Sequence, residues 1–243
     1  AGIPALREAV AAKFKRDNGL QYAPAQIVVA CGAKHALYNV MQIILEPGDE
    51  VIIPSPYWVS YPEFVTLADG VAVFIPTSAA ASFRMTPEQL ANAITPRTRA
   101  VVLNSPSNPT GMGYDAAALR ALAEVLAPHP RIAIISDEIY EPLVYGGFTH
   151  TSFAAAAPAL YERTFTVNGL SMSYSMTGWR LGYVACPDTA SADALQRLQD
   201  QSTTGVTSFI QPGAVAALTG PQDCVATMCA AFDERRALAG ASQ

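Results

Sequence analysis

The residues best suited to chemistry lie just after predicted strands. Asp137 ends the apolar run RIAIISD, and Tyr140 follows three positions later. Asn108 stands in the turn SPSNPTG after the run AVVLN, and Ser171 and Arg180 follow the run TFTVNG. Because ligands of open α/β sheets bind outside the carboxyl ends of the strands, we expect these groups to meet at one edge. Together, their carboxylate, phenol, amide, hydroxyl and guanidinium suit a flat, protonatable and phosphorylated heteroaromatic ring.

Two further features support a ligand at this edge. The run GAK opens a predicted helix, so the backbone N–H groups of Ala33 and Lys34 would face an anion. Trp58 lies in the aromatic run SPYWVSYPE after another strand and offers a flat surface. Each feature also has an ordinary structural explanation, since GAK could be a plain helix start, NPTG is a strong turn, and strand-end acids often cap helices. The combination at one sheet edge favours a ligand site.

The predicted positions of these residues follow from an alternation of strands and helices along the chain. Short, continuous apolar runs predict strands at 27–31, 51–54, 71–76, 100–104, 131–137, 164–169 and 181–187. Helical patterns occupy 34–45, 57–68, 86–94, 115–126, 188–200, 208–219 and 221–239. Continuous rather than alternating apolar strands are typical of a mostly parallel sheet that is covered on both faces. The sequence therefore predicts a three-layer α/β fold.

Composition narrows the class of protein. The 243 residues are 51% hydrophobic and 14% charged, which favours a folded core over disorder. The net charge of −5 comes without a basic run, which argues against nucleic acid as a partner, and no apolar stretch is long enough to span a membrane. The four cysteines have no CxxC spacing and the three histidines are scattered. We therefore expect a cytoplasmic protein with reduced cysteines and no metal site.

Several motifs together resemble the class I/II aminotransferases, which are pyridoxal 5′-phosphate (PLP) enzymes of fold type I. The motifs are YWVSYPE, NSPSNPTG, SDEIYE and SYSMTGWRLGY, which occur in that order. The similarity covers essentially the whole chain. They are most similar to the bacterial branch of aspartate-type aminotransferases. The resemblance implies the three-layer large domain of fold type I, with a mostly parallel mixed sheet. It also implies transfer of an amino group between an amino acid and a 2-oxo acid, a role in amino acid metabolism, and a homodimer in the full-length form.

The resemblance also assigns roles in binding PLP. Asp137 would pair with the pyridinium N1–H, so that the ring stays charged and acts as an electron sink. Asn108 and Tyr140 would hydrogen-bond the phenolic oxygen of the ring, and Asp137 and Tyr140 count as catalytic residues. Trp58 would lie on the ring face. The phosphate contacts would come from the amides of Ala33 and Lys34, the hydroxyl of Ser171 and the guanidinium of Arg180.

The chain departs from the family at the catalytic lysine. In the family, the Schiff-base lysine comes directly after the serine matched by Ser171, and here Met172 stands at that position. A thioether cannot form an imine and has no titratable proton, although its length and flexibility are close to those of lysine. Lys34 is the only lysine beyond residue 15, so no nearby lysine in the sequence replaces the missing one. We expect the fold to survive and the chain to have little or no transaminase activity.

Three interpretations of the whole chain stay open. The first is the cofactor-binding core of an aminotransferase, in which residues 1–243 form a single large domain without its N-terminal segment and C-terminal small domain, and 221–243 start the interdomain helix. The second is a non-catalytic PLP-binding protein that regulates or pairs with an active relative. The third is an unrelated dinucleotide-binding domain, which the absence of a GxGxxG motif after any strand disfavours. The amino acid substrate stays open.

Overall fold

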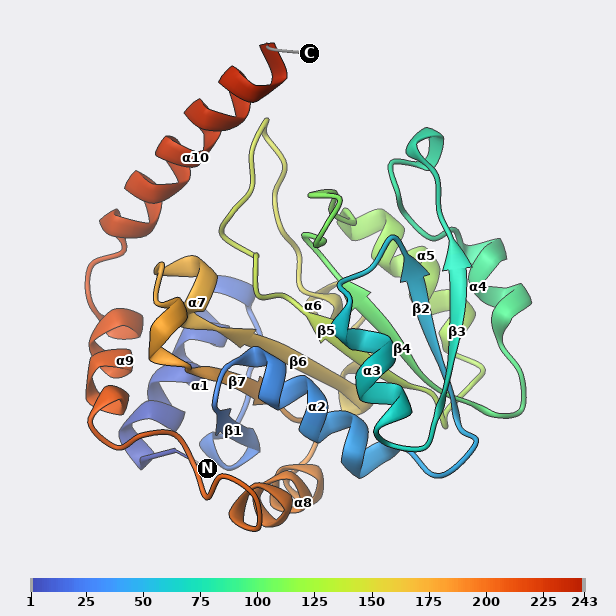
Figure 1. Cartoon of the computed structure of the whole chain (residues 1–243), viewed down its shortest axis with the longest axis horizontal. Coiled ribbons are helices and arrows are strands. Elements are labelled where there is room, and N and C mark those ends of the chain that lie inside the picture. The colour runs from blue at the N-terminus through green and yellow to red at the C-terminus, as the bar shows by residue number, and fades with distance from the viewer. Residues whose placement is uncertain (1, 242–243) are drawn as a thin grey trace.

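A central sheet organises the computed structural model, which describes residues 2–241 (Figure 1). Its strands are β1 (Ile27–Ala30), β2 (Glu50–Ser55), β3 (Val71–Pro76), β4 (Thr98–Asn104), β5 (Ala133–Asp137), β6 (Thr164–Gly169) and β7 (Gly182–Ala185). The order across the sheet is β1-β7-β6-β5-β4-β2-β3. Strand β7 runs antiparallel to both β6 and β1, and the other neighbours are parallel. The predicted mostly parallel mixed sheet is confirmed.

Helices cover both faces of this sheet, which confirms the three-layer prediction. One face carries α2 (Ala33–Ile44), α3 (Ser60–Thr66) and α8 (Thr189–Asp200). The other carries α1 (Pro4–Asn18), α4 (Pro87–Ala93), α5 (Ala116–Leu126), α6 (Phe153–Ala156) and α9 (Ile210–Thr219). Successive strand residues point to opposite faces, so each strand contributes to both cores. Ala100 and Val102 of β4 face α2, for example, while Val101 and Leu103 face α5.

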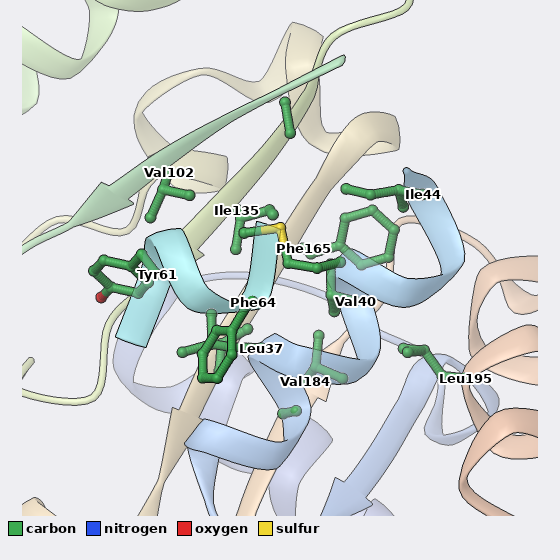
Figure 2. Close-up of a cluster of buried hydrophobic side chains, with 14 of the residues drawn as sticks. Leu37, Val40, Ile44, Tyr61, Phe64, Val102, Ile135, Phe165, Val184 and Leu195 are labelled. Carbon is green, nitrogen blue, oxygen red and sulfur yellow. The ribbon is translucent and has the colours of Figure 1, made fainter. Parts of the chain in front are cut away.

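Helix α2 is fixed to the sheet by one apolar stripe. Leu37, Val40 and Ile44 recur at helical spacing and are buried. Figure 2 shows them among Phe165 and Val184 of the sheet, and all five belong to one buried cluster. Because β1 leads into α2 at the carboxyl edge of the sheet, this packing holds the first turn of α2 at that edge.

The strand register aligns the ends that carry the candidate chemistry. Asn104 of β4 pairs with Asp137 of β5, and both are the last residues of their strands. Gly169, which ends β6, pairs with Gly182, which begins β7. The segments that follow β4, β5 and β6, and the one that precedes β7, therefore leave the sheet side by side.

Helix α10 (Asp223–Ala241) extends away from the rest of the chain (Figure 1). None of its side chains up to residue 239 is buried. The helix expected over 221–239 thus spans Asp223–Ala241, and residues 242–243 of the stretch 221–243 lie outside the described part. Between residues 2 and 241, no helix combines the length and the apolar content that a membrane crossing requires.

Candidate functional site

A cavity of about 200 Å³ opens at the carboxyl edge of the sheet. Its lining includes every site residue expected from the sequence, namely Ala33, Lys34, Trp58, Asn108, Asp137, Tyr140, Ser171, Met172 and Arg180. It also includes Leu37, Tyr61, Asn104 and Ile139, which the sequence did not single out. The structure thus brings the expected residues to one place, and their individual roles stay predictions.

Asp137 is the buried acid of the cavity. Its side chain accepts a hydrogen bond from the Tyr61 hydroxyl on Oδ2 at 2.6 Å and one from the Ile139 N–H on Oδ1 at 3.2 Å. Burial raises the pKa of Asp137 to about 6, although these two hydrogen bonds act in the opposite direction. Among residues 2–241, no basic side chain forms an ion pair with it. At neutral pH the site therefore presents a poorly solvated carboxylate that favours a cationic N–H partner.

A phenol and an amide meet beside this acid. The Asn108 side-chain nitrogen lies 3.5 Å from the Tyr140 hydroxyl, to which it donates. Asn104 orients Asn108, because its Oδ1 accepts from the Asn108 backbone N–H at 2.7 Å while its Nδ2 donates to the Asp137 carbonyl at 3.0 Å. Burial, and then the charge of Asp137, raise the pKa of Tyr140, so its hydroxyl keeps its proton at neutral pH.

The first turn of α2 is an open anion site. Helices α4, α5 and α8 each begin with a side chain that accepts a backbone N–H of the first turn. Gly32, the residue before α2, provides no such cap, and the N–H groups of Ala33 and Lys34 find no acceptor among residues 2–241. Unpaired N–H groups at the positive end of a helix favour an anion.

Arg180 adds a guanidinium to this anion site. A Cβ on Gly32 would lie 2.5 Å from Nη2 of Arg180, so the guanidinium packs directly on the glycine that precedes α2. Its Nη1 donates to the Thr177 carbonyl at 2.8 Å, and it has no carboxylate partner within the described chain. Arg180 has a left-handed backbone (φ 50°), a conformation that is uncommon for residues other than glycine and is found at functional sites. The arrangement suits a phosphate.

Gly182 lets β7 approach the start of α2, and its substitution tests this packing. A Cβ there would lie 2.2 Å from the backbone nitrogen of Ala33. We expect Gly182→Ala to lower the free energy of unfolding by about 1–3 kcal/mol, because the backbone must shift to make room. Urea unfolding measures the change. Gly178→Ala, whose Cβ would meet open space, is the control. Equal urea midpoints for the two variants would contradict the close approach of Gly182 to Ala33.

Trp58 and Met172 close the remaining sides of the cavity. The Trp58 ring makes edge contacts with Tyr61 and Phe64, at centroid distances of 5.4 Å and 6.0 Å. The Nζ of Lys34 lies 4.9 Å from the centre of the Trp58 ring. Met172 lies in the short helix α7 (Leu170–Ser173) and is partly exposed. The position of the missing lysine therefore faces the cavity from the same segment that carries Ser171.

Sequence reasoning missed two residues of this site. Tyr61 was included only as part of the aromatic run SPYWVSYPE, yet its hydroxyl donates to Asp137. Asn104 was counted only as the end of a strand, yet it bonds the turn of Asn108 to β5. Asn104 could have been identified from its position, because it is the first residue of the NSPSNPTG motif. For Tyr61, the helical spacing of three residues from Trp58 was the corresponding signal.

The three-layer fold and this cavity define the large domain of fold type I PLP-dependent transferases. The sequence profile of class I and II aminotransferases matches residues 1–240. The chain belongs to this aminotransferase family.

Named relatives of the chain are aspartate aminotransferases. The aspartate aminotransferase of Geobacillus stearothermophilus is 53% identical over 234 residues, which are 96% of this chain and 59% of that protein. The aspartate/prephenate aminotransferase of Cereibacter sphaeroides is 51% identical over 237 residues, or 98% of this chain and 59% of that protein. The crystal structure of the aspartate aminotransferase from Rhizobium meliloti matches with a TM-score of 0.95 at 48% identity, covering 98% of this chain and 59% of that one. The chain thus spans about three fifths of the length of these relatives.

Proposed function

We propose that this chain is the PLP-binding core of an aminotransferase that moves an amino group between an amino acid and a 2-oxo acid. The observation that carries the proposal is the pairing of two sites in one cavity. A buried carboxylate, Asp137, lies in the same cavity as an anion site built from Arg180 and the start of α2. PLP has a protonatable ring nitrogen and a phosphate, so each site has a matching group. When bound, PLP supplies the electron-withdrawing ring on which amino-group transfer depends.

The residues of the cavity divide between the ring and the phosphate. Asp137 would accept the ring N–H, Tyr140 and Asn108 would hydrogen-bond the phenolic oxygen, and Trp58 would cover a ring face. The Ala33 and Lys34 amides, the Ser171 hydroxyl and the Arg180 guanidinium would hold the phosphate. This division follows the burial of Asp137 and the exposure of Arg180, because the more hydrated phosphate suits the more exposed end.

Met172 limits what the chain does with this cofactor. The family's lysine supplies an amine that bonds to the cofactor and carries a proton, and Met172 supplies neither. We therefore propose that PLP binds here through non-covalent contacts and that the chain has little or no transaminase activity. Within the lining of the cavity, Lys34 has the remaining amine, which lies over the Trp58 ring. Its place at the start of α2 suits attraction of an anionic ligand group.

A non-catalytic PLP-binding protein is the second candidate function. The observation that favours it is the convergence of both ring-binding and phosphate-binding groups around Met172. Such a protein would bind PLP reversibly and would regulate or pair with an active relative. Loss of PLP on simple dialysis, together with binding to an active aminotransferase, would support this candidate.

We also propose the organisation of the whole protein. Residues 1–243 would be a single large domain of a longer cytoplasmic protein that forms a homodimer, with 221–243 as the start of the connection to a further domain. The greater length of the relatives supports this proposal. The exposure of α10 also supports it, because the side chains of this helix up to residue 239 are not buried and leave a surface free to pack.

Removing the guanidinium of Arg180 tests the proposed function. We expect Arg180→Ala to weaken PLP binding about ten- to hundred-fold, because a charge-assisted contact to phosphate is lost. Titration followed by absorbance or calorimetry, with PLP and with pyridoxal, measures the effect. Pyridoxal lacks the phosphate, so its weaker binding should not change. Arg120→Ala, which removes an exposed guanidinium from α5, is the matched control. Equal affinity of the parent chain for PLP and pyridoxal would contradict the proposal.

A further inference from the structure

The segment after β5 directs its side chains to two sides. Asp137 and Tyr140 line the cavity. Glu138 and Glu141, each the next residue along, instead enter a buried cluster of charged groups. Their side chains are only 1% and 10% exposed. Each of the two cavity residues is therefore followed directly by a carboxylate that is anchored elsewhere.

Glu138 is held by a complete set of donors. Its Oε1 accepts from the hydroxyls of Ser136 and Ser152 at 2.7 Å and 2.8 Å, and from the Phe153 N–H at 3.2 Å. Its Oε2 lies 3.3 Å from Nε2 of His150. Burial alone would raise the pKa of Glu138, but the hydrogen bonds from His150, Ser136 and Ser152 bring it below its ordinary value. The carboxylate is therefore charged and fixed at neutral pH.

Glu141 is held from helix α1. The ammonium of Lys13 forms a close ion pair with its Oε1, and the side-chain amide of Asn18 donates to its Oε2 at 3.0 Å. The Lys13 side chain is only 5% exposed, and its Nζ also donates to Oδ1 of Asn18 at 2.9 Å. Nε2 of His150 lies 3.9 Å from Glu141, which joins the two carboxylates into one cluster.

A metal ion is the less suitable interpretation of this cluster. Glu138, Glu141 and His150 do have ligand atoms within 4.8 Å of one another. However, Lys13 already places an ammonium on Glu141, and a divalent cation beside it would be repelled at short range. The hydroxyl and amide donors on Glu138 occupy Oε1, and its Oε2 already faces Nε2 of His150. The cluster is therefore better suited to fixing the chain than to binding a cation.

We propose that Lys13 is a positioning residue for the cavity, and that it acts by anchoring Glu141 so that Tyr140 keeps its place. The proposal rests on the proposed function of the cavity as a PLP site.

The backbone transmits this anchoring to the cavity. The Glu141 N–H donates to the Glu138 carbonyl at 3.0 Å, and the Leu143 N–H donates to the Tyr140 carbonyl at 2.9 Å. The Glu138 N–H in turn donates to the Val167 carbonyl of β6 at 2.9 Å. The segment is thus a series of tight turns in which a shift of Glu141 moves its neighbour Tyr140. Without Lys13, Glu141 would be a buried carboxylate without its cation, and such a group moves toward water.

Lys13→Met in the 243-residue chain tests the inference through ligand affinity. We expect PLP binding to weaken about tenfold, which corresponds to the loss of one good hydrogen bond. A second titration uses 3-deoxypyridoxal phosphate, which lacks the phenolic oxygen that Tyr140 would contact. Comparing the two ligand affinities separates an effect on Tyr140 from a general loss of stability. The affinity for the 3-deoxy analogue should change little, because the variant acts through Tyr140. Circular dichroism at the titration temperature verifies that the variant is folded.

Glu50→Gln is the matched control, because Glu50 is also a buried carboxylate but lies at the amino end of β2. It accepts from the Thr95 hydroxyl at 2.5 Å and from Nε of Arg97 at 2.9 Å, far from the cavity. We expect it to lower stability without changing PLP affinity. Where Lys13→Met does not fold, Glu141→Gln carries the test with the same expected result. In that variant Asp17, 3.9 Å from the Lys13 ammonium, remains to pair with it.

Three outcomes would contradict the inference, and the first of them would contradict the proposed function as well. A parent chain that does not bind PLP overturns the proposed function, and the inference with it. A parent chain that binds PLP, with unchanged affinity in folded Lys13→Met and Glu141→Gln, overturns the inference alone. An equal loss of affinity for PLP and for its 3-deoxy analogue also overturns it, because the effect would then not pass through the phenolic oxygen.

Discussion

Replacing Met172 with lysine should give this chain a covalent bond to PLP that it otherwise lacks. The two side chains are similar in length, and Met172 lines the same cavity as Tyr140 and Asp137. A lysine amine there would reach the same space and would be free to react with the aldehyde. After borohydride reduction, peptide mass spectrometry should find PLP on residue 172 of Met172→Lys and on no residue of the parent chain.

The same substitution should also raise the rate of transamination. A positioned acid–base group contributes about 10²- to 10⁴-fold, so the PLP-loaded variant should react faster by about that factor with aspartate, the amino acid in the names of its relatives. Met172→Gln, which has similar length but no nucleophilic amine, is the control. It should form no PLP adduct and should not raise the rate of transamination. A parent chain that already reacts as fast as Met172→Lys would show that the role given to position 172 is wrong. A reduced PLP adduct on Lys34 of the parent chain would also contradict the role given to position 172.

The fold was predictable because local patterns determine most of it. The strands are short apolar runs without alternation, since both faces of the sheet are covered, and the helices α4 and α8 begin at capping residues that the sequence shows. Residues at strand ends, such as Asp137 and Asn108, could be assigned to one edge because parallel strands end on the same side. Helix α10 illustrates the limit at element ends, because it was expected over 221–239 and spans Asp223–Ala241.

The supporting contacts of the site were not predictable in the same way. Tyr61 and Asp137 are 76 positions apart, and their hydrogen bond depends on how closely α3 approaches β5. Lys13 is a more extreme case, because a lysine on a helix normally points to solvent. Its burial follows from the approach of α1 to the segment of Glu141, which no local pattern specifies. Distances between separate elements are what a single sequence leaves undetermined.

Asp137→Asn should weaken PLP binding about ten- to hundred-fold at pH 8, because a charge-assisted hydrogen bond to the ring N–H is lost.

The same change should stabilise the ligand-free chain. Burial raises the pKa of Asp137 from 3.8 to about 6, so the folded chain holds this proton more tightly than the unfolded chain does. Stability therefore falls as pH rises between these values, by about 3 kcal/mol in total, and stays lowered above pH 6. Thermal unfolding should show Asp137→Asn more stable than the parent at pH 8, with a difference that shrinks as the pH falls from 6 toward 3.8.

The pH dependence of binding separates the carboxylate from the phosphate. Below about pH 6 the free chain carries the proton on Asp137, and a cationic ring nitrogen must displace it, so affinity falls by up to about tenfold per pH unit. The phosphate of PLP also titrates near pH 6, and that step should survive in Asp137→Asn. With pyridoxal, which has no phosphate, the parent should keep the step and the variant should lose it. Asp137→Asn that binds PLP like the parent at pH 8 would rule out Asp137 as the partner of the ring nitrogen. The opposed effects on stability and binding arise from one cause, since the buried carboxylate is unfavourable until a cation lies beside it.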